Sequence, residues 1–215
     1  MAASYGIDSI AYLRRARTRL NERSQEALFY AAYELRCGTE SRLQDYLDAR
    51  EDIANKKKKG WHIMDSAKEL DRAIRLGDKI AEAAIVDADG ATVVAAFYTP
   101  VSARLRETAG ARLHDLLHTM KRSFPNDDRW WSDTRTFLEH IYSDLELANK
   151  GTLLGPMMLS PDRKKLNMMM SVRHDSPIAD KVSLFGQVGA VSTIRVRYHD
   201  SLPDYATPFL NRTVA

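Results

Sequence analysis

The longest helical pattern in the sequence lies between Leu28 and Tyr46, where apolar and small residues recur every three or four positions. This spacing places them on one side of an α-helix, which turns about 100° per residue. Ser24 or Asn21 can cap the amino end of the helix by accepting a backbone hydrogen bond. A helix of this length with one apolar side needs other helices to cover that side, so the sequence favours a helical bundle.

Four further segments have a helical pattern: residues 7–20, 66–82, 104–122 and 132–150. The first of them carries a run of arginines on its polar side. In the second, Ser66 and Glu69 have the spacing of a capping box, in which each side chain bonds a backbone amide of the first turn. Between the helices, Asn55–Gly60 (NKKKKG) predicts an exposed lysine-rich loop.

The remaining segments predict β-structure. Residues 84–99 contain two apolar runs around an Asp-Gly pair, which is typical of a β-hairpin. After Gly151 the helical periodicity is lost, and short apolar or alternating segments follow, with a hairpin bend expected at residues 160–163. We therefore expect an α+β protein, a predominantly helical bundle with an inserted β-hairpin and a small β-rich C-terminal region. The expected division is a helical domain over residues 1–151, which includes the hairpin, and a β-rich region over 152–215 packed on the same core.

Two features of the C-terminal region concern possible surfaces. Near its end, an apolar set alternates with a basic set, namely Ile194, Val196 and Tyr198 with Arg195, Arg197 and His199. In a strand this alternation gives one apolar face and one basic face. The methionines at 157, 158 and 168–170 are interpreted as filling for the core, since thioether side chains adapt to irregular gaps.

Composition limits the environment and the partners of the chain. The 215 residues are enough to bury a core, and the single cysteine, Cys37, cannot form an internal disulfide, which favours the reducing cytoplasm. We expect no signal peptide and no membrane span, because the first residues lack a basic and apolar leader and no run reaches about 18 apolar residues. A net charge of +3 permits a polyanionic partner without requiring one.

Residues 104–122 (RLRETAGARLHDLLHTMKR) combine an apolar stripe with groups able to do acid-base chemistry. The stripe contains Leu105, Ala109, Leu113, Leu116, Leu117 and Met120, and the residues off the stripe are Arg112, His114, Asp115, His118 and Arg122. Imidazole titrates near neutral pH, and guanidinium offers a forked, permanently charged donor for phosphate. The sequence has no phosphate-binding glycine loop, cysteine-pair metal site or nucleophile elbow. A candidate active centre is therefore expected in this segment.

Two other sites were considered on the same grounds. His114 and His118 stand four residues apart on one face and could bind a metal with a third ligand such as Asp115, but the pair alone does not define a metal site, and none is expected. Lys57 and Lys58, close to Trp61, could hold phosphates while a base stacks on the indole. The alternative for these lysines is an exposed loop that only interacts with water.

The segments ALFYAAYELRCGTESRLQDYL (residues 27–47) and RLHDLLH (112–118) resemble the HEPN superfamily of helical nucleotide-binding and RNA-cleaving domains, over roughly residues 8–150. The catalytic motif of that family is an Arg and a His separated by four to six residues, which Arg112 and His118 match. The resemblance implies that His118 acts as general acid or base on the ribose 2′-hydroxyl or the leaving oxygen, while Arg112 stabilises phosphoryl charge. It also implies a homodimer whose two copies face each other, with no metal or cofactor.

Two departures from the family pattern concern the same motif. Leu113 follows Arg112 where the family commonly has a polar residue. In an ideal helix Arg112 and His118 lie about 120° apart, so they converge only through the reach of the arginine, a helix end or a partner subunit. By geometry alone Arg122, four residues after His118, is the better placed phosphate partner.

The sequence thus predicts a cytoplasmic HEPN-like RNA-binding protein or metal-independent endoribonuclease, in a toxin or defence role, with RNA, a second copy and a protein such as an antitoxin as partners. The expected catalytic residues are Arg112 and His118, and those expected to bind substrate are His114, Asp115, Arg122, Lys57 and Lys58. The alternative is a non-catalytic helical interaction or scaffold protein that dimerises. In that case the polar groups at residues 112–118 form hydrogen bonds and ion pairs at an interface.

Overall fold

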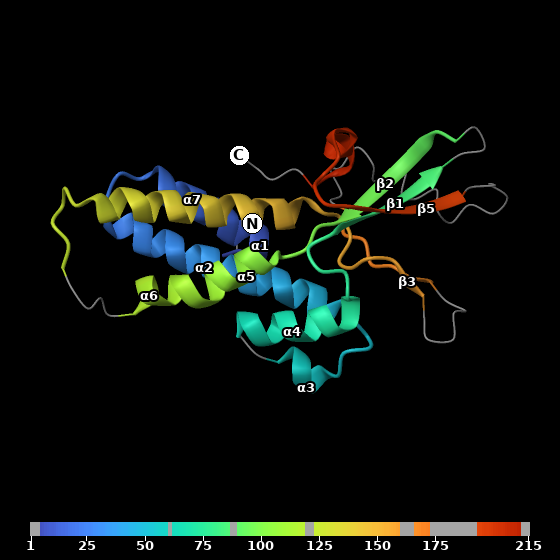
Figure 1. Ribbon diagram of the computed structural model, residues 1–215, viewed down its shortest axis with the longest axis horizontal. Helices are drawn as coiled ribbons and strands as arrows, with labels where there is room; N and C mark the ends of the chain where they lie inside the picture. Colours follow the sequence, from blue (N-terminus) through green and yellow to red (C-terminus); the bar gives the residue numbers. More distant parts are fainter. Residues whose placement is uncertain are drawn as a thin grey trace. The chain divides into compact units, whose positions relative to one another are not determined.

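The computed structural model describes residues 5–59, 62–86, 90–118, 123–159, 166–172 and 193–211. These residues form an α+β fold in which helices predominate, as the sequence predicts (Figure 1). The chain divides into two compact units: a helical unit over residues 1–75 and 101–149, and a sheet unit over residues 76–100 and 150–212. The expected boundary at residue 151 does not describe this division, because the hairpin belongs with the C-terminal region.

The helical unit contains α1 (Ser9–Asn21), α2 (Glu26–Asp48), α3 (Asn55–Lys58), α4 (Ile63–Ile74), α5 (Ala103–Glu107), a π-helical turn (Thr108–Arg112), α6 (Leu113–Leu117) and α7 (Arg129–Lys150). The helices predicted for residues 7–20, 24–47 and 132–150 are confirmed as α1, α2 and α7. The Oγ atom of Ser24 accepts a hydrogen bond from the amide of Ala27 at 3.2 Å, which is the capping role expected from the sequence.

The apolar side of α2 forms the centre of the helical unit. Its buried residues include Ala27, Leu28, Ala31, Ala32, Leu35, Leu43, Tyr46 and Leu47. At Gly38 the helix comes closest to its neighbours: a Cβ there would lie 2.9 Å from Cδ2 of Leu145 in α7 and 3.2 Å from Cβ of Tyr12 in α1. The missing side chain therefore allows three helices to meet at one level.

The helix predicted for residues 66–82 is wrong at both ends. The observed helix, α4, begins at Ile63, so Ser66 lies inside it and no capping box forms with Glu69. At the other end, Arg75 adopts a left-handed backbone conformation with φ 54°, which terminates the helix. The chain then enters a strand at Ile80.

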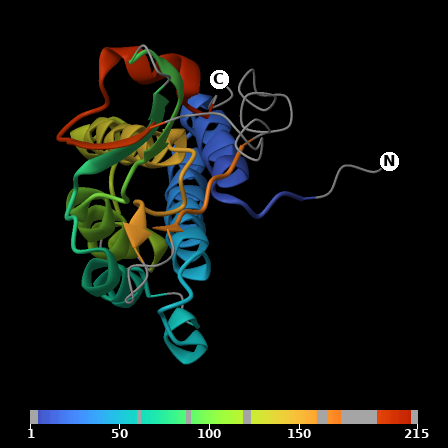
Figure 2. The ribbon, with the colours of Figure 1, turned by 90° about the vertical axis from the view of Figure 1, so that its right-hand side faces the viewer.

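Asn55–Lys58 of the lysine-rich segment form a short helix and not the predicted loop, whereas Gly60 and Trp61 lie outside the described residues. This helix, α3, has no buried residue, so the prediction of exposure is confirmed while the prediction of irregular structure is wrong. In both views α3 lies at the carboxyl end of α2, next to α4 (Figure 1 and Figure 2).

The sheet unit contains β1 (Ile80–Val86), β2 (Thr92–Tyr98), β3 (Met158–Leu159), β4 (Leu166–Asn167), β5 (Thr193–His199) and a 3₁₀ helix, η3 (Asp204–Phe209). The predicted hairpin is confirmed as β1 and β2, and β5 pairs antiparallel with the other edge of β1, giving the order β2-β1-β5. The bend expected at residues 160–163 lies outside the described residues, although β3 and β4, on either side of it, pair antiparallel.

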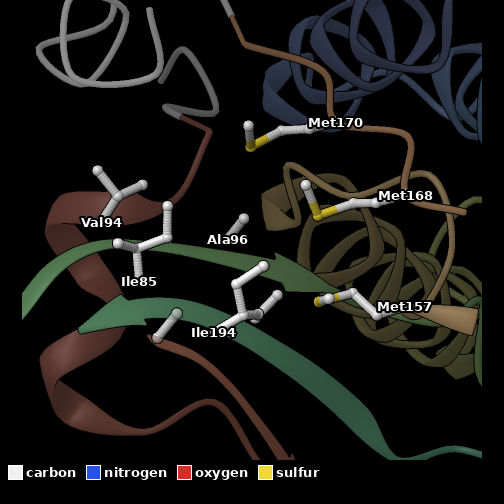
Figure 3. Close-up of a pocket in the computed structure, with 9 residues that line it drawn as sticks. Ile85, Val94, Ala96, Met157, Met168, Met170 and Ile194 are labelled. Atoms are coloured by element: carbon white, nitrogen blue, oxygen red, sulfur yellow. The ribbon is translucent and has the colours of Figure 1, made fainter. Parts of the chain in front are cut away.

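Different segments pack against the two faces of the three-stranded sheet. On one face Ile80, Ala84, Ala95 and Phe97 pack against Ala206 of η3. On the other face an apolar pocket lies between the sheet and three methionines. It is lined by Ala83, Ala84, Ile85, Val94, Ala96, Met157, Met168, Met170 and Ile194 (Figure 3). Met157, Met168 and Met170 thus cover part of this face. The prediction that the five methionines fill the core is confirmed only in part, because Met168 and Met169 are exposed and the other three are only partly buried.

Candidate functional site

The candidate catalytic residues lie on a segment that changes helix type. α5 passes through the π-helical turn into α6, which ends at Leu117, earlier than predicted. Leu105, Ala109 and Leu113 are fully buried and Leu116 is buried, which confirms the inward stripe at these positions. Leu117 is only partly buried, and Met120 lies outside the described residues. In a regular α-helix two successive spacings of four residues drift by about 80°. The wider π turn offsets this drift and keeps Leu105, Ala109 and Leu113 in the core.

The polar side of this segment carries a histidine pair, His114 and His118. Nε2 of His118 lies 3.1 Å from Nδ1 of His114, and the ring centroids are 3.9 Å apart. Which of the two nitrogens donates and which accepts depends on the tautomer of each ring. His118 ends α6 with an extended backbone, and both histidines are exposed, as is Asp115.

Arg112 is held away from the pair by α7. Its Cζ lies 4.4 Å from the centroid of the Phe137 ring, a cation-π distance. In the part of the chain that the structure describes, no hydrogen bond joins Arg112 to His118, in keeping with the angular separation expected from the sequence. Arg122, the other predicted phosphate partner, lies outside the described residues.

An aromatic cluster at the amino end of α7 was missed in the sequence. Phe124 stacks on Trp130 with centroids 4.3 Å apart and planes inclined by 12°, and Trp131 meets Trp130 edge to face at 4.7 Å. Trp131 also contacts Phe29 of α2 and donates its indole N–H to the carbonyl of Pro125 at 2.8 Å. The sequence signal that could have predicted the cluster is that Phe124, Trp130 and Trp131 lie close together along the chain.

This cluster and the histidine pair lie at the same end of the helical unit. Figure 1 shows the amino ends of α2 and α7 and the carboxyl end of α6 together at the left of that unit. Phe124, Trp130 and Trp131 are all partly exposed. The elements that carry the partly exposed aromatic cluster and the exposed imidazoles thus end at the same end of the helical unit.

The lysine-rich segment forms one wall of a polar hollow between α3 and α4. The hollow, of about 410 Å³, is lined by Lys56, Lys57, Lys59, His62, Asp65, Ser66, Lys68, Glu69 and Arg72. Lys57 Nζ lies 2.8 Å from Glu69 Oε2, and this hydrogen bond is the main reason that the pKa of Glu69 is lowered. Lys58 is partly buried and is not among the lining residues. The surface carries more cations than carboxylates, although Lys57 itself is paired.

A second polar centre lies on the sheet, around Glu82. The Glu82 side chain is 0% exposed. Its Oε2 accepts a hydrogen bond from the Tyr205 hydroxyl at 2.8 Å and lies 2.8 Å from Nε2 of His199. Arg195 approaches Oε1 to 3.8 Å and donates to Oγ1 of Thr92 at 2.9 Å. The sequence identified the basic side of β5 but not its acidic partner, which lies in a strand composed otherwise of apolar residues.

Comparisons with protein-family models, with curated proteins and with solved structures found no match. Within the described ranges, no helix has both the length and the apolar character needed to cross a membrane. Nor do three or more histidine, cysteine or acidic side chains in those ranges gather as a group that could hold a metal ion. The resemblance to the HEPN superfamily stays a prediction.

Proposed function

We propose that the protein is a HEPN-like cytoplasmic protein that binds single-stranded RNA and cleaves it without a metal ion, in a toxin or defence role. The observation that supports this most directly is the contact between the exposed rings of His114 and His118. Cleavage of RNA by its own 2′-hydroxyl needs a base to remove the hydroxyl proton and an acid to protonate the leaving oxygen. Two imidazoles in contact place two groups side by side that can take these roles, one as the base and the other as the acid.

Arg112 supports the proposal as an oriented cation. Its guanidinium, stacked on Phe137, is fixed on the same segment as the histidines and exposed to solvent. A guanidinium in this position attracts the phosphodiester and can stabilise charge that develops on it. Asp115, the lysines of the polar hollow and Arg122 are the further groups proposed to contact RNA, the cations among them by neutralising backbone phosphates.

The test of the proposal is the cleavage of a mixed pool of single-stranded RNA in the presence of EDTA, which removes metal-dependent contaminants. The wild type is expected to cut, whereas a double variant with His114→Ala and His118→Ala is expected not to cut. Both side chains are exposed, so the double variant should fold. Absence of cutting by the wild type, with a retained gel shift, would leave RNA binding without catalysis. If the wild type neither cuts the RNA nor shifts it on a gel, the proposal is wrong.

The aromatic cluster leads to a prediction about RNA affinity. Stacking of a base on an aromatic side chain contributes roughly 1–3 kcal/mol, so Trp130→Ala is expected to weaken binding of a short single-stranded RNA by about 5–150-fold. Affinities are measured by fluorescence anisotropy, with Trp130→Ala introduced into the variant that already carries His114→Ala and His118→Ala, so that cleavage does not interfere with binding. Tyr198→Ala, which removes an exposed aromatic residue of the sheet unit, is the matched control. Equal affinities of the Trp130 variant and the control would contradict base stacking at the cluster.

A non-catalytic role in protein association is the second candidate, and one surface favours it. Tyr30 and Tyr33 lie almost one helical turn apart on α2 with 59% and 53% of their surfaces exposed, and Arg19 lies over the Tyr30 ring at 5.3 Å. Tyrosine and arginine are enriched in protein interfaces. A homodimer through this surface would be detected by sedimentation equilibrium and lost on replacing both tyrosines with alanine.

A further inference from the structure

We propose that the sheet unit contains a binding site for a phosphate monoester, formed by Arg195, Arg197, His199 and Tyr205 around the buried carboxylate of Glu82. The site belongs to residues of the sheet unit only. It is independent of the RNA proposal, which concerns the helical unit.

The register of the sheet brings the charged groups together. Glu82 on β1 is directly opposite Arg197 on β5, and the pairs on either side along the same face are Ile80 with His199 and Ala84 with Arg195. Side chains at every second position of a strand point to the same face, so two guanidinium groups and one imidazole surround a single carboxylate.

The buried carboxylate fixes the positions of these donors. Oε2 of Glu82 bonds to both His199 and Tyr205, which ties β5 and η3 to β1. The other oxygen, Oε1, and the Nε atom of Arg195 are buried and have no hydrogen-bond partner among the described residues. Buried polar atoms without partners are rare and costly. The Nε of Arg195 is therefore a donor that lacks an acceptor, and an oxygen of an anionic ligand can supply one, whereas Oε1 of Glu82 is itself an acceptor and is approached only by Arg195.

The outer rim of the centre is open to an anion. Arg197 is exposed, contacts the Tyr205 hydroxyl and forms no ion pair with a carboxylate in the described ranges. Tyr205 is also exposed, and burial of its hydroxyl is the main reason that its pKa is raised, so it stays a hydrogen-bond donor at neutral pH. Arg195 and His199 are partly exposed.

The charge of the centre selects the chemical class of the ligand. Two guanidinium groups and one carboxylate leave one positive charge, which becomes two when His199 is protonated. Forked guanidinium donors match the oxygens of a phosphoryl group. A phosphate monoester, which carries two negative charges and three terminal oxygens, complements this set better than a diester with one charge.

Isothermal titration calorimetry at constant ionic strength tests the site with methyl phosphate as the monoester probe and dimethyl phosphate as the diester probe. We expect one methyl phosphate per chain and at least tenfold weaker binding of dimethyl phosphate. Arg197→Gln is expected to weaken methyl phosphate binding at least tenfold, since a hydrogen bond to a charged group is lost. Arg14→Gln removes the same charge from the exposed side of α1 and should leave the affinity unchanged.

Absence of methyl phosphate binding, or equal affinity of wild type and Arg197→Gln, would overturn the site, and equal binding of both probes would overturn its assignment to monoesters. Circular dichroism checks the fold of each variant. Should Arg197→Gln fail to fold, Arg197→Lys takes its place: it keeps the charge but loses the fork, and unchanged affinity in that variant would also overturn the proposal.

Discussion

Replacing His118 with alanine is expected to lower the rate of the proposed RNA cleavage by about 10²–10⁴-fold, the range typical for loss of a general acid or base. In the proposed mechanism His114 and His118 supply the acid and the base as one unit, because Nε2 of His118 lies 3.1 Å from Nδ1 of His114. Groups that act as a unit show non-additive losses. His114→Ala should therefore cost nearly as much as His118→Ala, and the double variant should lose little more than either single variant.

Initial rates on a fluorescent single-stranded RNA, measured in EDTA, check this expectation. His140→Ala is the matched control, because it removes an exposed histidine of α7 that lies outside the pair. The control should cleave at the wild-type rate. Wild-type activity in His118→Ala, or an equal loss in His140→Ala, would show that the histidine pair is not the catalytic centre.

Gly151→Ala is expected to lower the free energy of unfolding by about 3 kcal/mol, at the upper end of the usual cost of overpacking. A Cβ at Gly151 would lie 2.5 Å from Oγ1 of Thr99, 2.6 Å from the carbonyl oxygen of Phe97 and 2.8 Å from the amide nitrogen of Thr99. Two of these atoms are backbone atoms, one in β2 and one in the residue directly after it, and they cannot move aside without loss of hydrogen bonds. One of those bonds joins the amide of Leu153 to the Phe97 carbonyl at 2.9 Å.

Gly155→Ala is the matched control for this prediction, because a Cβ at Gly155 would meet no atom within 4 Å. Urea unfolding followed by circular dichroism gives both free energies, and hydrogen exchange of the β2 amides reports where the loss occurs. We expect the control to stay near the wild type or to gain a few tenths of a kcal/mol from reduced freedom of the unfolded chain. Similar values for both variants would refute the steric argument.

Helices whose packing is set by their own periodicity could be predicted from the sequence. The inward positions of α2 and of residues 104–117 followed from the spacing of apolar residues alone, and the Asp-Gly pair identified the hairpin. These signals are local, so they require no knowledge of which segments meet.

Features that depend on distant contacts could not be predicted in the same way. α4 ends because Arg75 adopts a left-handed backbone conformation, and arginine is not a residue type from which this conformation can be predicted. The assignment of the hairpin to the sheet unit depends on the pairing of β1 with β5, more than a hundred residues later. In the sequence Glu82 is a single polar residue in an apolar strand. Its role becomes visible only in the structure, where His199 and Tyr205 contact its carboxylate.

In the candidate active centre too, the local arrangement could be predicted from the sequence, and the contacts with other helices could not. A spacing of four residues on a helix put His114 and His118 on one face, and the structure brings their rings into contact. The position of the Arg112 guanidinium depends on Phe137 of another helix, and the neighbouring aromatic cluster depends on how α7 begins beside α2. Neither contact has a signature in residues 112–118.

The pocket in Figure 3 is closed on one side by thioether groups, which gives it a chemical property that a wall of leucine or isoleucine would lack. Methionine sulfur is converted by peroxide to a sulfoxide, which is polar, and reductases reverse the change. Met157, Met168 and Met170 all have some contact with solvent. The apolar character of this face of the sheet is therefore not fixed by the sequence alone, since oxidants can remove it and reductants can restore it.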